Sequence, residues 1–370
     1  MIRWSRYLLI FPFILLLSSC HVVRFVWWNF ADINDSKKFP VDTLKNAPPY
    51  FHFFSMSRQS SISLPAGFKQ GCDTCSLDSY LVKHKTVAFL IIRNDTLICE
   101  KYYKGYNREA IFPSFSITKS YVSALVGIAI DEGYIKSVNQ PVTDFIPELK
   151  SGGFQKVTIK DLLEMRSGID FSENYINPFG KIGKFYYGLN LHKYTLKLKV
   201  VTEPGKVYNY QSANAQILAM VIERATGKRL SDYLREKIWK PLGMEYDGTW
   251  SLDSKKHRDI KAFCCINGRA VDFAKFGRLY LDNGQWDNKE IIPAGWVHES
   301  LTTSNDSKDI QGYPYTYMWR VLDNHDFFAK GLLGEFIYVS PRKNTIIVRI
   351  GTKSGDLNWP ELFKEIVAEL

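Results

Sequence analysis

The two ends of the chain carry apolar patterns that are typical of β-strands. Residues 86–105, TVAFLIIRNDTLICEKYYKG, place two β-rich runs around the turn-forming residues 93–96, which predicts a hairpin. Near the C-terminus, residues 335–351, EFIYVSPRKNTIIVRIG, repeat that arrangement around residues 341–344. The closing segment PELFKEIVAEL spaces its apolar residues three and four apart, which predicts an amphipathic helix.

Between the two hairpins the period of the apolar positions changes from two residues to about 3.6. Helical patterns cover residues 116–133, 157–167, 213–227, 229–239 and 270–284. Strands at both ends with helices between them predict an α/β fold of the α+β type. In it, both ends of the chain build one antiparallel sheet flanked by helices, and a mainly helical region is inserted at about residues 116–300.

The first twenty residues differ from the rest. Arg3 and Arg6 precede an apolar run at residues 7–17, and small residues then lead to Cys20. This order is typical of an export signal and resembles the lipobox of bacterial lipoproteins, in which the cysteine is lipidated after cleavage. We expect a signal peptide at 1–19, a lipidated Cys20 with a tether at 20–38, and a folded domain at 39–370. The alternative is an uncleaved signal anchor.

That resemblance also implies a location. A lipidated Cys20 would hold the protein at a membrane on the periplasmic side without a spanning helix. His21 follows the cysteine where an aspartate would favour retention at the inner membrane. We therefore expect an outer-membrane lipoprotein.

Charge changes the picture little. The 370 residues include 48 basic and 38 acidic side chains, interleaved along the whole length, for a formal charge of +10. No block of like charge occurs, so we do not expect nucleic-acid binding. The most basic stretch, residues 181–199, mixes five lysines with aromatics. It can line a groove for an anionic ligand, but a solvated surface is the favoured interpretation.

The spacing of the cysteines is only weak evidence for a metal site. Cys72 and Cys75 have CxxC spacing, but no βαβ pattern frames them, and the remaining candidates are Cys99 and the adjacent Cys264 and Cys265. A local disulfide or two free thiols are favoured over zinc, and export would permit disulfides. No HExxH, P-loop or GxGxxG motif occurs, so we expect neither a metal nor an organic cofactor.

A serine and a lysine stand three residues apart at the start of a long apolar helix, in FPSFSITKSYVSALVGIAI. A helix beginning near Ser116 puts Lys119 one turn later on the same side. It also places the Ser116 amide among the unpaired donors at the positive end of the helix. Acyl transfer needs these parts: a hydroxyl, an amine that takes its proton and a donor for the oxyanion. The alternative is an N-capping serine followed by a solvated lysine.

Ser340 and Lys343 have the same S-x-x-K spacing but are a weaker candidate for a catalytic pair. This pair lies at a strand-to-turn junction that contains Pro341, so nothing there would hold the two side chains on a common face.

A lysine that acts as a base further requires burial or a nearby cation, because its pKa must fall from about 10.4 towards neutrality. The apolar residues after Lys119 favour such burial.

Several motifs in order resemble the serine β-lactamase and penicillin-recognising family. They are FSITKS, LLEMRSGIDF, PGKVYNYQSANAQILAMVIERATG, GRLYLDNGQWDNKEIIPAGWV and GLLGEFIYVSPRKNTIIVRIG, and the resemblance covers residues 39–370. The chain is most similar to the branch with 6-aminohexanoate-dimer hydrolases, class C β-lactamase-like esterases and D-amino-acid peptidases. Several ordered motifs are more specific than any one of them.

The resemblance implies roles for individual residues. Ser116 falls on the nucleophile and Lys119 on its base. Tyr210 falls on the tyrosine of the Tyr-x-Asn motif, where it would relay a proton between serine, lysine and leaving group. Gly331 ends the third motif, and the amide of Leu332 becomes the second oxyanion donor beside the amide of Ser116.

Three departures shape the expected substrate. Ser212 replaces the asparagine of Tyr-x-Asn, so a substrate-binding amide is shortened to a hydroxyl. Ala329, Lys330 and Gly331 stand where β-lactamases have Lys-Thr-Gly or His-x-Gly. Glu173 begins a sequence similar to the deacylation motif of class A enzymes, but it follows SGIDF directly, where this branch carries a loop over the site. We therefore do not expect Glu173 to activate the deacylating water.

The resulting expectation is a serine hydrolase that acts through an acyl-enzyme on an ester, a linear amide or a D-amino-acid peptide. One alternative is a β-lactamase or D,D-peptidase, and another is a non-catalytic envelope lipoprotein that binds a ligand. The partner is a small molecule or short peptide. Aromatics in residues 172–200 and 300–320, Tyr175 among them, line a pocket or form a packed lid.

Overall fold

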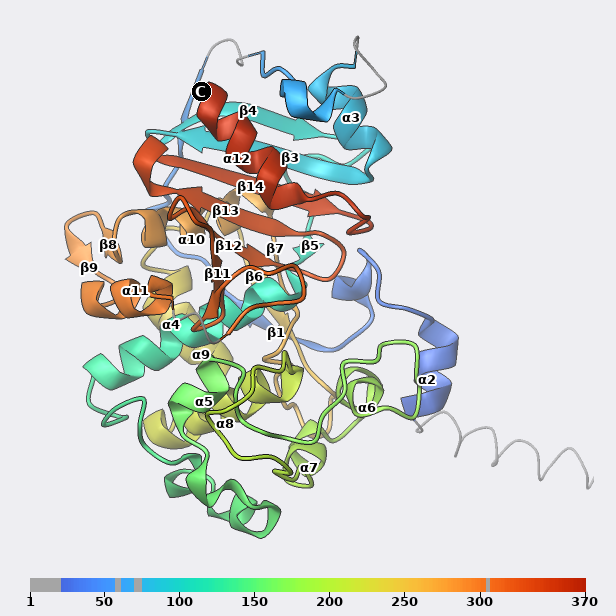
Figure 1. The fold of residues 1–370 in the computed structure, drawn as a ribbon, viewed down its shortest axis with the longest axis vertical. Helices are drawn as coiled ribbons and strands as arrows, with labels where there is room; N and C mark the ends of the chain where they lie inside the picture. The colour runs from blue at the N-terminus through green and yellow to red at the C-terminus, as the bar shows by residue number, and fades with distance from the viewer. Residues whose placement is uncertain (1–20, 57–60, 70–74, 304–306) are drawn as a thin grey trace, which may run out of the picture.

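Figure 1 shows a broad sheet above a mainly helical region, with the C-terminus on the sheet side. The computed structural model describes residues 21–56, 61–69, 75–303 and 307–370. The strands are β1 (Val41–Leu44), β2 (Phe54–Ser55), β3 (Thr86–Arg93), β4 (Thr96–Tyr102), β5 (Phe112–Pro113), β6 (Gly248–Ser251), β7 (Ile266–Gly268), β8 (Gln285–Trp286), β9 (Lys289–Glu290), β10 (Tyr315–Thr316), β11 (Trp319–Val321), β12 (Phe327–Lys330), β13 (Phe336–Ser340) and β14 (Thr345–Gly351).

The large sheet joins the two ends of the chain. Its order is β10-β11-β12-β13-β14-β3-β4-β2, and the pairing of β14 with β3 connects the two predicted hairpins. Neighbouring strands are antiparallel except β2 and β4, which are parallel. The predicted antiparallel sheet built from both ends of the chain is confirmed.

The helices fill the middle of the chain and flank the sheet. They are α2 (His21–Trp28), α3 (Leu77–Lys83), α4 (Thr118–Asp131), α5 (Ile159–Leu163), α6 (Lys181–Tyr187), α7 (Leu191–Thr195), α8 (Ser212–Thr226), α9 (Leu230–Leu234), α10 (Ala270–Leu281), α11 (Ala294–Leu301) and α12 (Trp359–Glu369). Short helical turns include η1 (Asp35–Lys37), η3 (Phe115–Ile117), the π-helical turn η7 (Arg235–Trp239) and η8 (Pro341–Lys343). Among the described helices, none is long and apolar enough to cross a membrane.

The alternation along each strand divides the core into two layers. Phe89 and Ile91 of β3 pack with Leu81 of α3 and Phe363 of α12 on one face. Leu90 and Ile92 face the other way, into the core shared with α4, α8 and α10. Because both faces are covered, β3 and β14 are buried along nearly their whole length, which explains their continuous apolar runs.

Two predicted helices are shorter in the structure than their patterns. The pattern at 157–167 yields only α5, which starts at a capping box formed by Thr158 and Asp161. It ends before Met165, whose φ is +57°. The pattern at 229–239 yields α9, which continues into the π-helical turn η7.

The structure differs from the expected tether over residues 20–38. From His21 on, these residues fold as α2 and η1 against α6, with Phe25 and Ile33 in the core. The hydroxyl of Tyr186 donates to Asp35, and Lys38 pairs with Asp35 at 2.7 Å. The polar residues that suggested a tether are therefore partners of buried groups. Cys20 lies outside the described residues.

A small sheet of order β1-β6-β7-β5 lies beside the start of α4. β5 pairs with β7 through Phe112 opposite Gly268 and Pro113 opposite Asn267. This pairing ends directly before the predicted nucleophile. It therefore fixes where α4 begins.

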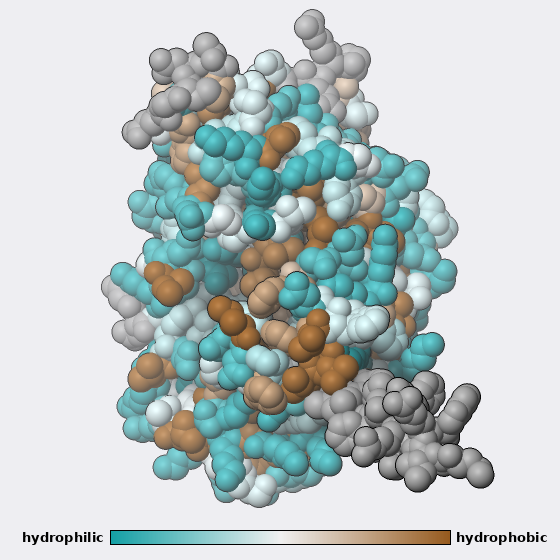
Figure 2. All heavy atoms as spheres, turned by 90° about the vertical axis from the view of Figure 1, so that its right-hand side faces the viewer, coloured by the Kyte–Doolittle hydropathy of each residue, from teal (hydrophilic) through white to brown (hydrophobic). Residues whose placement is uncertain are grey.

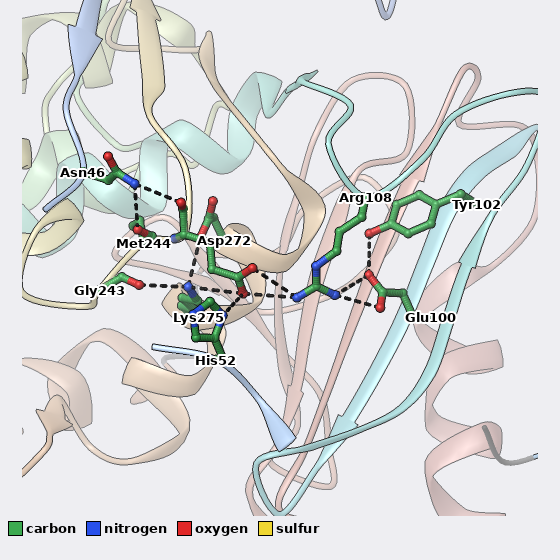
Figure 3. Close-up of polar contacts among 10 residues, drawn as sticks. Asn46, His52, Glu100, Tyr102, Arg108, Gly243, Met244, Asp272 and Lys275 are labelled. Carbon is green, nitrogen blue, oxygen red and sulfur yellow. Dashed lines mark hydrogen bonds and ion pairs between the residues drawn. The ribbon is translucent and has the colours of Figure 1, made fainter. Parts of the chain in front are cut away.

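A buried network of charges joins the sheet to the helical region (Figure 3). Lys275 of α10 contacts Asp272 at 3.1 Å and Glu245 at 3.6 Å. Arg108 bridges Glu245 and Glu100 of β4 at 3.1 and 2.6 Å. The network links three segments of the chain, at residues 100–108, at Glu245 and at residues 272–275.

Candidate active site

Ser116 stands at a sharp turn between β5 and α4. The preceding residue, Phe115, has a φ of +44°, a left-handed conformation that costs free energy for a side chain of this size and often marks a functional site. The hydroxyls of Ser114 and Thr118 lie 2.8 Å apart, and the Ile266 amide donates to Thr118 Oγ1 at 3.1 Å. These bonds attach the turn to β7 and hold Ser116 in one orientation.

Lys119 lies beneath the serine, as the helical spacing predicts. Its side chain is only 1% exposed. Its Nζ donates to Ser116 Oγ at 2.8 Å and to the Phe263 carbonyl at 2.7 Å. The amine is therefore within reach of the proton that the serine must lose.

Tyr210 closes the same group of side chains from above. Lys119 Nζ lies 5.0 Å from the centre of its ring, and Tyr210 precedes α8 by two residues. The ring packs edge-on against Tyr315, with centres 5.9 Å apart, and the Arg320 guanidinium lies 5.6 Å from its centre. The structure thus brings together the three residues predicted to be catalytic.

The two predicted oxyanion donors lie on the same cleft. The Ser116 amide is in the first turn of η3, where no earlier carbonyl of the helix can accept from it. Within the described residues, the Leu332 amide donates to no other group. Gly331 has a steric reason to be glycine, because a Cβ there would lie 2.8 Å from the Ser114 carbonyl and 2.4 Å from Glu335 Oε2.

The cleft has a volume of about 580 Å³. Ser116, Tyr175, Tyr210, Gly331 and Leu332 line it. This volume is within the usual range for sites that bind small molecules. Two of the predicted catalytic residues, two of the predicted contact residues and both predicted oxyanion residues therefore meet at one opening.

Charged side chains line one wall of the cleft. Arg320 pairs with Asp309 at 2.5 Å, whereas Lys330 donates to Gln311 Oε1 at 2.9 Å. Burial, and then the nearby Arg320 guanidinium, lowers the pKa of Lys330 to about 8. Sequence reasoning noted Lys330 only as a departure from a motif, but its side chain faces the cleft.

Ser212 does not line the cleft. It is 1% exposed and is the first residue of α8. Its amide donates to Glu173 Oε1, and its hydroxyl lies 3.2 Å from Glu173 Oε2. The shortened side chain therefore binds a protein carboxylate.

Glu173 is part of the cleft wall, in the segment that the motif resemblance predicts to lie over the site. It accepts hydrogen bonds from Ser212 and from the Tyr175 hydroxyl. Burial, and then the Glu173 carboxylate, raises the pKa of Tyr175 well above its usual range. The carboxylate thus caps the start of α8 and fixes the Tyr175 ring.

Two backbone features near the lysine could not be found from sequence patterns. The Phe263 carbonyl accepts from Lys119 Nζ, and a carbonyl carries no signal of residue type. Directly after it, Cys264 and Cys265 form a disulfide with each other. Cys99 is a buried free cysteine, and Cys72 lies outside the described residues.

Size alone would select a different hollow. A cavity of about 830 Å³ lies between α11 and the β10–β12 region and includes His298, Tyr313 and His325. None of the predicted catalytic side chains lines it. The chemistry of Ser116 and Lys119 therefore decides which opening is the candidate active site.

Comparisons with known proteins agree with this geometry. The sequence profile of the Beta-lactamase family matches residues 79–362. Over 310 residues the chain is 26% identical to the 6-aminohexanoate-dimer hydrolase of Paenarthrobacter ureafaciens, covering 77% of this chain and 76% of the relative.

Solved structures show the same fold. The structure named "Putative 6-aminohexanoate-dimer hydrolase from Bacillus anthracis" superposes with a TM-score of 0.81 at 22% identity, over 93% of each chain. A family VIII carboxylesterase superposes with a TM-score of 0.62 at 18% identity, over 79% of this chain and 95% of that one. The profile match over residues 79–362 shows that the chain belongs to the beta-lactamase family, and its relatives in that family support a serine hydrolase.

Proposed function

We propose that Ser116 is the nucleophile of this hydrolase, with Lys119 as its base and Tyr210 as the proton relay. The observation that carries the proposal is the 2.8 Å contact between Lys119 Nζ and Ser116 Oγ at the bottom of the cleft. Lys119 also binds the Phe263 carbonyl, so its amine has a fixed direction. Fixed geometry of this kind supplies much of the rate enhancement in acyl transfer.

The reaction then has two halves. Ser116 Oγ forms a bond to the substrate carbonyl carbon while Lys119 takes its proton, and the amides of Ser116 and Leu332 bind the oxyanion. The bond to the leaving group breaks as Tyr210 donates a proton to it. Water next attacks the acyl-enzyme, giving its proton back through Tyr210 and Lys119, and the Ser116 hydroxyl is restored.

Intact mass after exposure to a fluorophosphonate tests the nucleophile. The full chain is the right material, because residues 21–38 pack into the core. We expect one adduct on the parent protein and none on Ser116→Ala. The absence of an adduct on folded parent protein would overturn the proposal and favour a non-catalytic ligand-binding protein.

We propose a small carboxylic ester or a linear amide as the substrate class. The names of the relatives support this choice, since one is a hydrolase of an amide dimer and another is a carboxylesterase. The Ala329-Lys330-Gly331 sequence also departs from the β-lactamase pattern. A chromogenic cephalosporin separates the alternatives: turnover faster than that of p-nitrophenyl esters would favour a β-lactamase or D,D-peptidase.

We further propose that the protein is an exported lipoprotein, anchored through Cys20 at the periplasmic side of the outer membrane. The sequence before α2 supports this, and so does the surface of α2, where Val26 is 71% and Trp27 82% exposed. Figure 2 shows apolar side chains gathered on the face that carries α2 and α6. Phe179, 68% exposed, belongs to the loop before α6.

Metabolic labelling with a palmitate analogue, followed by fractionation of the envelope, tests the anchor. We expect label on the parent protein in the outer-membrane fraction and no label on Cys20→Ser. An unlabelled parent protein that stays with the inner membrane would support the uncleaved signal anchor instead.

A further inference from the structure

A smaller hollow of about 230 Å³ adjoins the catalytic cleft. Tyr175 and Leu332 line both spaces. The other walls come from α6, through Ile182, and from the N-terminal segment, through Phe25, Phe30 and Ala31. The hollow therefore opens beside the amide that we assign to the oxyanion.

The lining of this hollow is uncharged throughout. Its three tyrosines present their rings, because each hydroxyl is bound elsewhere: Tyr175 donates to Glu173, Tyr186 to Asp35 and Tyr187 to the Asn29 carbonyl at 2.6 Å. Phe25 is 9% and Ile182 1% exposed, whereas Phe30 is 51% exposed and stands at the rim. The surface that lines this hollow is therefore apolar, whereas the wall of the catalytic cleft carries the charged side chain of Lys330.

The position of the hollow decides which part of a substrate it can hold. Tyr210, the proposed proton donor to the leaving group, does not line it. Leu332, whose amide would hold the carbonyl oxygen, does. With the oxygen on that amide and the leaving group towards Tyr210, the acyl group points to the hollow.

We propose that this hollow is an acyl pocket for an apolar acyl group of the substrate, with Phe25, Phe30 and Ala31 as one wall. The inference rests on the proposed function and names its substrate class: esters or amides of medium-chain or arylalkyl carboxylic acids. A cavity of about 150 Å³ holds benzene. A pocket of about 230 Å³ therefore has room for roughly six to eight carbons.

Hydrolysis of p-nitrophenyl acetate, butyrate, hexanoate, octanoate and dodecanoate by the full chain in lipid nanodiscs tests the pocket. We expect kcat/KM to rise about fourfold per buried methylene, equivalent to about 0.8 kcal/mol. The rise should continue to hexanoate or octanoate and stop before dodecanoate. Equal kcat/KM for all five esters would overturn the inference.

Ala31→Trp adds a side chain at the pocket, whereas Val26→Trp adds the same side chain at an exposed position of α2. We expect Ala31→Trp to lower the hexanoate-to-acetate ratio of kcat/KM at least tenfold, mainly through KM, and Val26→Trp to leave it unchanged. Ile182→Ala enlarges the pocket and should move the optimum to a longer chain. Equal ratios in both tryptophan variants, with Ile182→Ala at the parent's optimum, would contradict the assignment.

Binding without turnover separates this inference from the proposed function. Calorimetric titration of Ser116→Ala with p-nitrophenyl hexanoate should give tighter binding than with the acetate, and Ala31→Trp in that background should remove the difference. If Ser116 took no fluorophosphonate but this difference in binding remained, the proposed function would fail and the pocket would stand. If Ser116 reacted but chain length had no effect, the pocket alone would fail.

Discussion

Lys119 and Lys275 are both buried in helices, yet their ammonium groups meet opposite kinds of partner. Lys119 Nζ contacts a hydroxyl, a backbone carbonyl and an aromatic ring, all uncharged. Lys275 Nζ contacts the Gly243 carbonyl at 2.9 Å and the carboxylates of Asp272 and Glu245 (Figure 3). Lys275 belongs to a buried ion-pair network with two carboxylates, whereas Lys119 Nζ faces the serine hydroxyl.

Lys261 is a third buried lysine, and it has both uncharged partners and nearby charged groups. Its Nζ donates to the Tyr186 carbonyl at 2.8 Å and lies over the Phe39 ring. Burial, and then the nearby Arg24 guanidinium, lowers the pKa of Lys261 well below its usual range. The lesson is that burial alone does not assign a role to a lysine. The charge of its neighbours separates a structural ion pair from a proton acceptor.

Replacing Lys119 should give the largest loss of activity, and it is the most direct test of the difference between Lys119 and Lys275. In Lys119→Met we expect kcat to fall by about four orders of magnitude or more, because the variant lacks the amine that contacts Ser116 Oγ at 2.8 Å. The free energy of unfolding should change little, because an apolar side chain replaces a buried cation without stranding a carboxylate. Steady-state kinetics beside urea unfolding measures both.

Ser116→Ala combined with Lys119→Met is the control. Residues that act as a unit fail together, so the double variant should be no slower than either single one. Losses that multiply would show that Lys119 acts apart from the serine.

Lys275→Met should show the reverse pattern. It leaves the buried carboxylate of Asp272 without its cation, whereas Glu245 keeps Arg108, and stranding a buried charge costs about 3–5 kcal/mol of stability. In the fraction that stays folded, kcat should remain near the parent value. Adding Asp272→Asn should restore part of the stability. A loss of activity at full stability would break the distinction between the two lysines.

Tyr210→Phe tests whether the Tyr210 hydroxyl relays the proton between Ser116, Lys119 and the leaving group. We expect kcat to fall about 10²- to 10³-fold, the usual contribution of an acid or base, with KM changed less. Tyr208→Phe is a matched control, since Tyr208 also packs against Tyr315 and its hydroxyl has no hydrogen-bond partner in the part of the chain that the structure describes. A smaller loss at Tyr210 than at Tyr208 would remove Tyr210 from the mechanism.

Replacing Glu335 should give the smallest effect of this series, a change in how stability depends on pH. Glu335 is a buried carboxyl group and extends the comparison of buried lysines to an acidic side chain. Burial raises its pKa to about 8, and the Leu333 amide donates to Glu335 Oε2 at 3.0 Å. The folded protein therefore keeps this proton at pH 7, whereas the unfolded chain releases it near pH 4. This contribution to stability is complete below that lower pH and is lost as the pH rises through about 8.

Glu335→Gln should remove that dependence. We expect its free energy of unfolding to match the parent near pH 4 and to exceed it by roughly 1–3 kcal/mol at pH 8–9. Glu361→Gln, at a carboxylate that is 42% exposed, should leave the parent's pH profile unchanged. Parallel profiles for Glu335→Gln and the parent would contradict the raised pKa.

Local patterns in the sequence predicted most of the elements. Period-two runs gave both hairpins of the large sheet, and period-3.6 runs gave α4, α8, α10 and α12 close to their observed bounds. The spacing of Ser116 and Lys119 predicted their contact, because one helical turn fixes that distance. Motif resemblance added Tyr210, Gly331 and Leu332, which lie at the same cleft.

Contacts between distant segments were beyond local patterns. Residues 21–38 were expected to form a tether, but Asp35 pairs with Lys38 and accepts a hydrogen bond from Tyr186 of α6. Ser212 seemed free to meet a substrate until Glu173, 39 residues earlier, proved to bind it. A side chain's partner depends on which segments the fold brings together, and neighbouring residues carry no record of that.

The sequence by itself determined most of the elements and the contact between Ser116 and Lys119, because these depend on periodicity or on residues within one helical turn, and its ordered motifs indicated the family. The tertiary structure decided which partners each buried group has. It decided that Lys275 contacts carboxylates, that the Phe263 carbonyl accepts from Lys119, and that Phe25 of α2 lines a pocket beside Leu332. These are properties of packing between residues far apart in the chain. They exist only once burial has removed water and left each polar group with the partners that the fold provides.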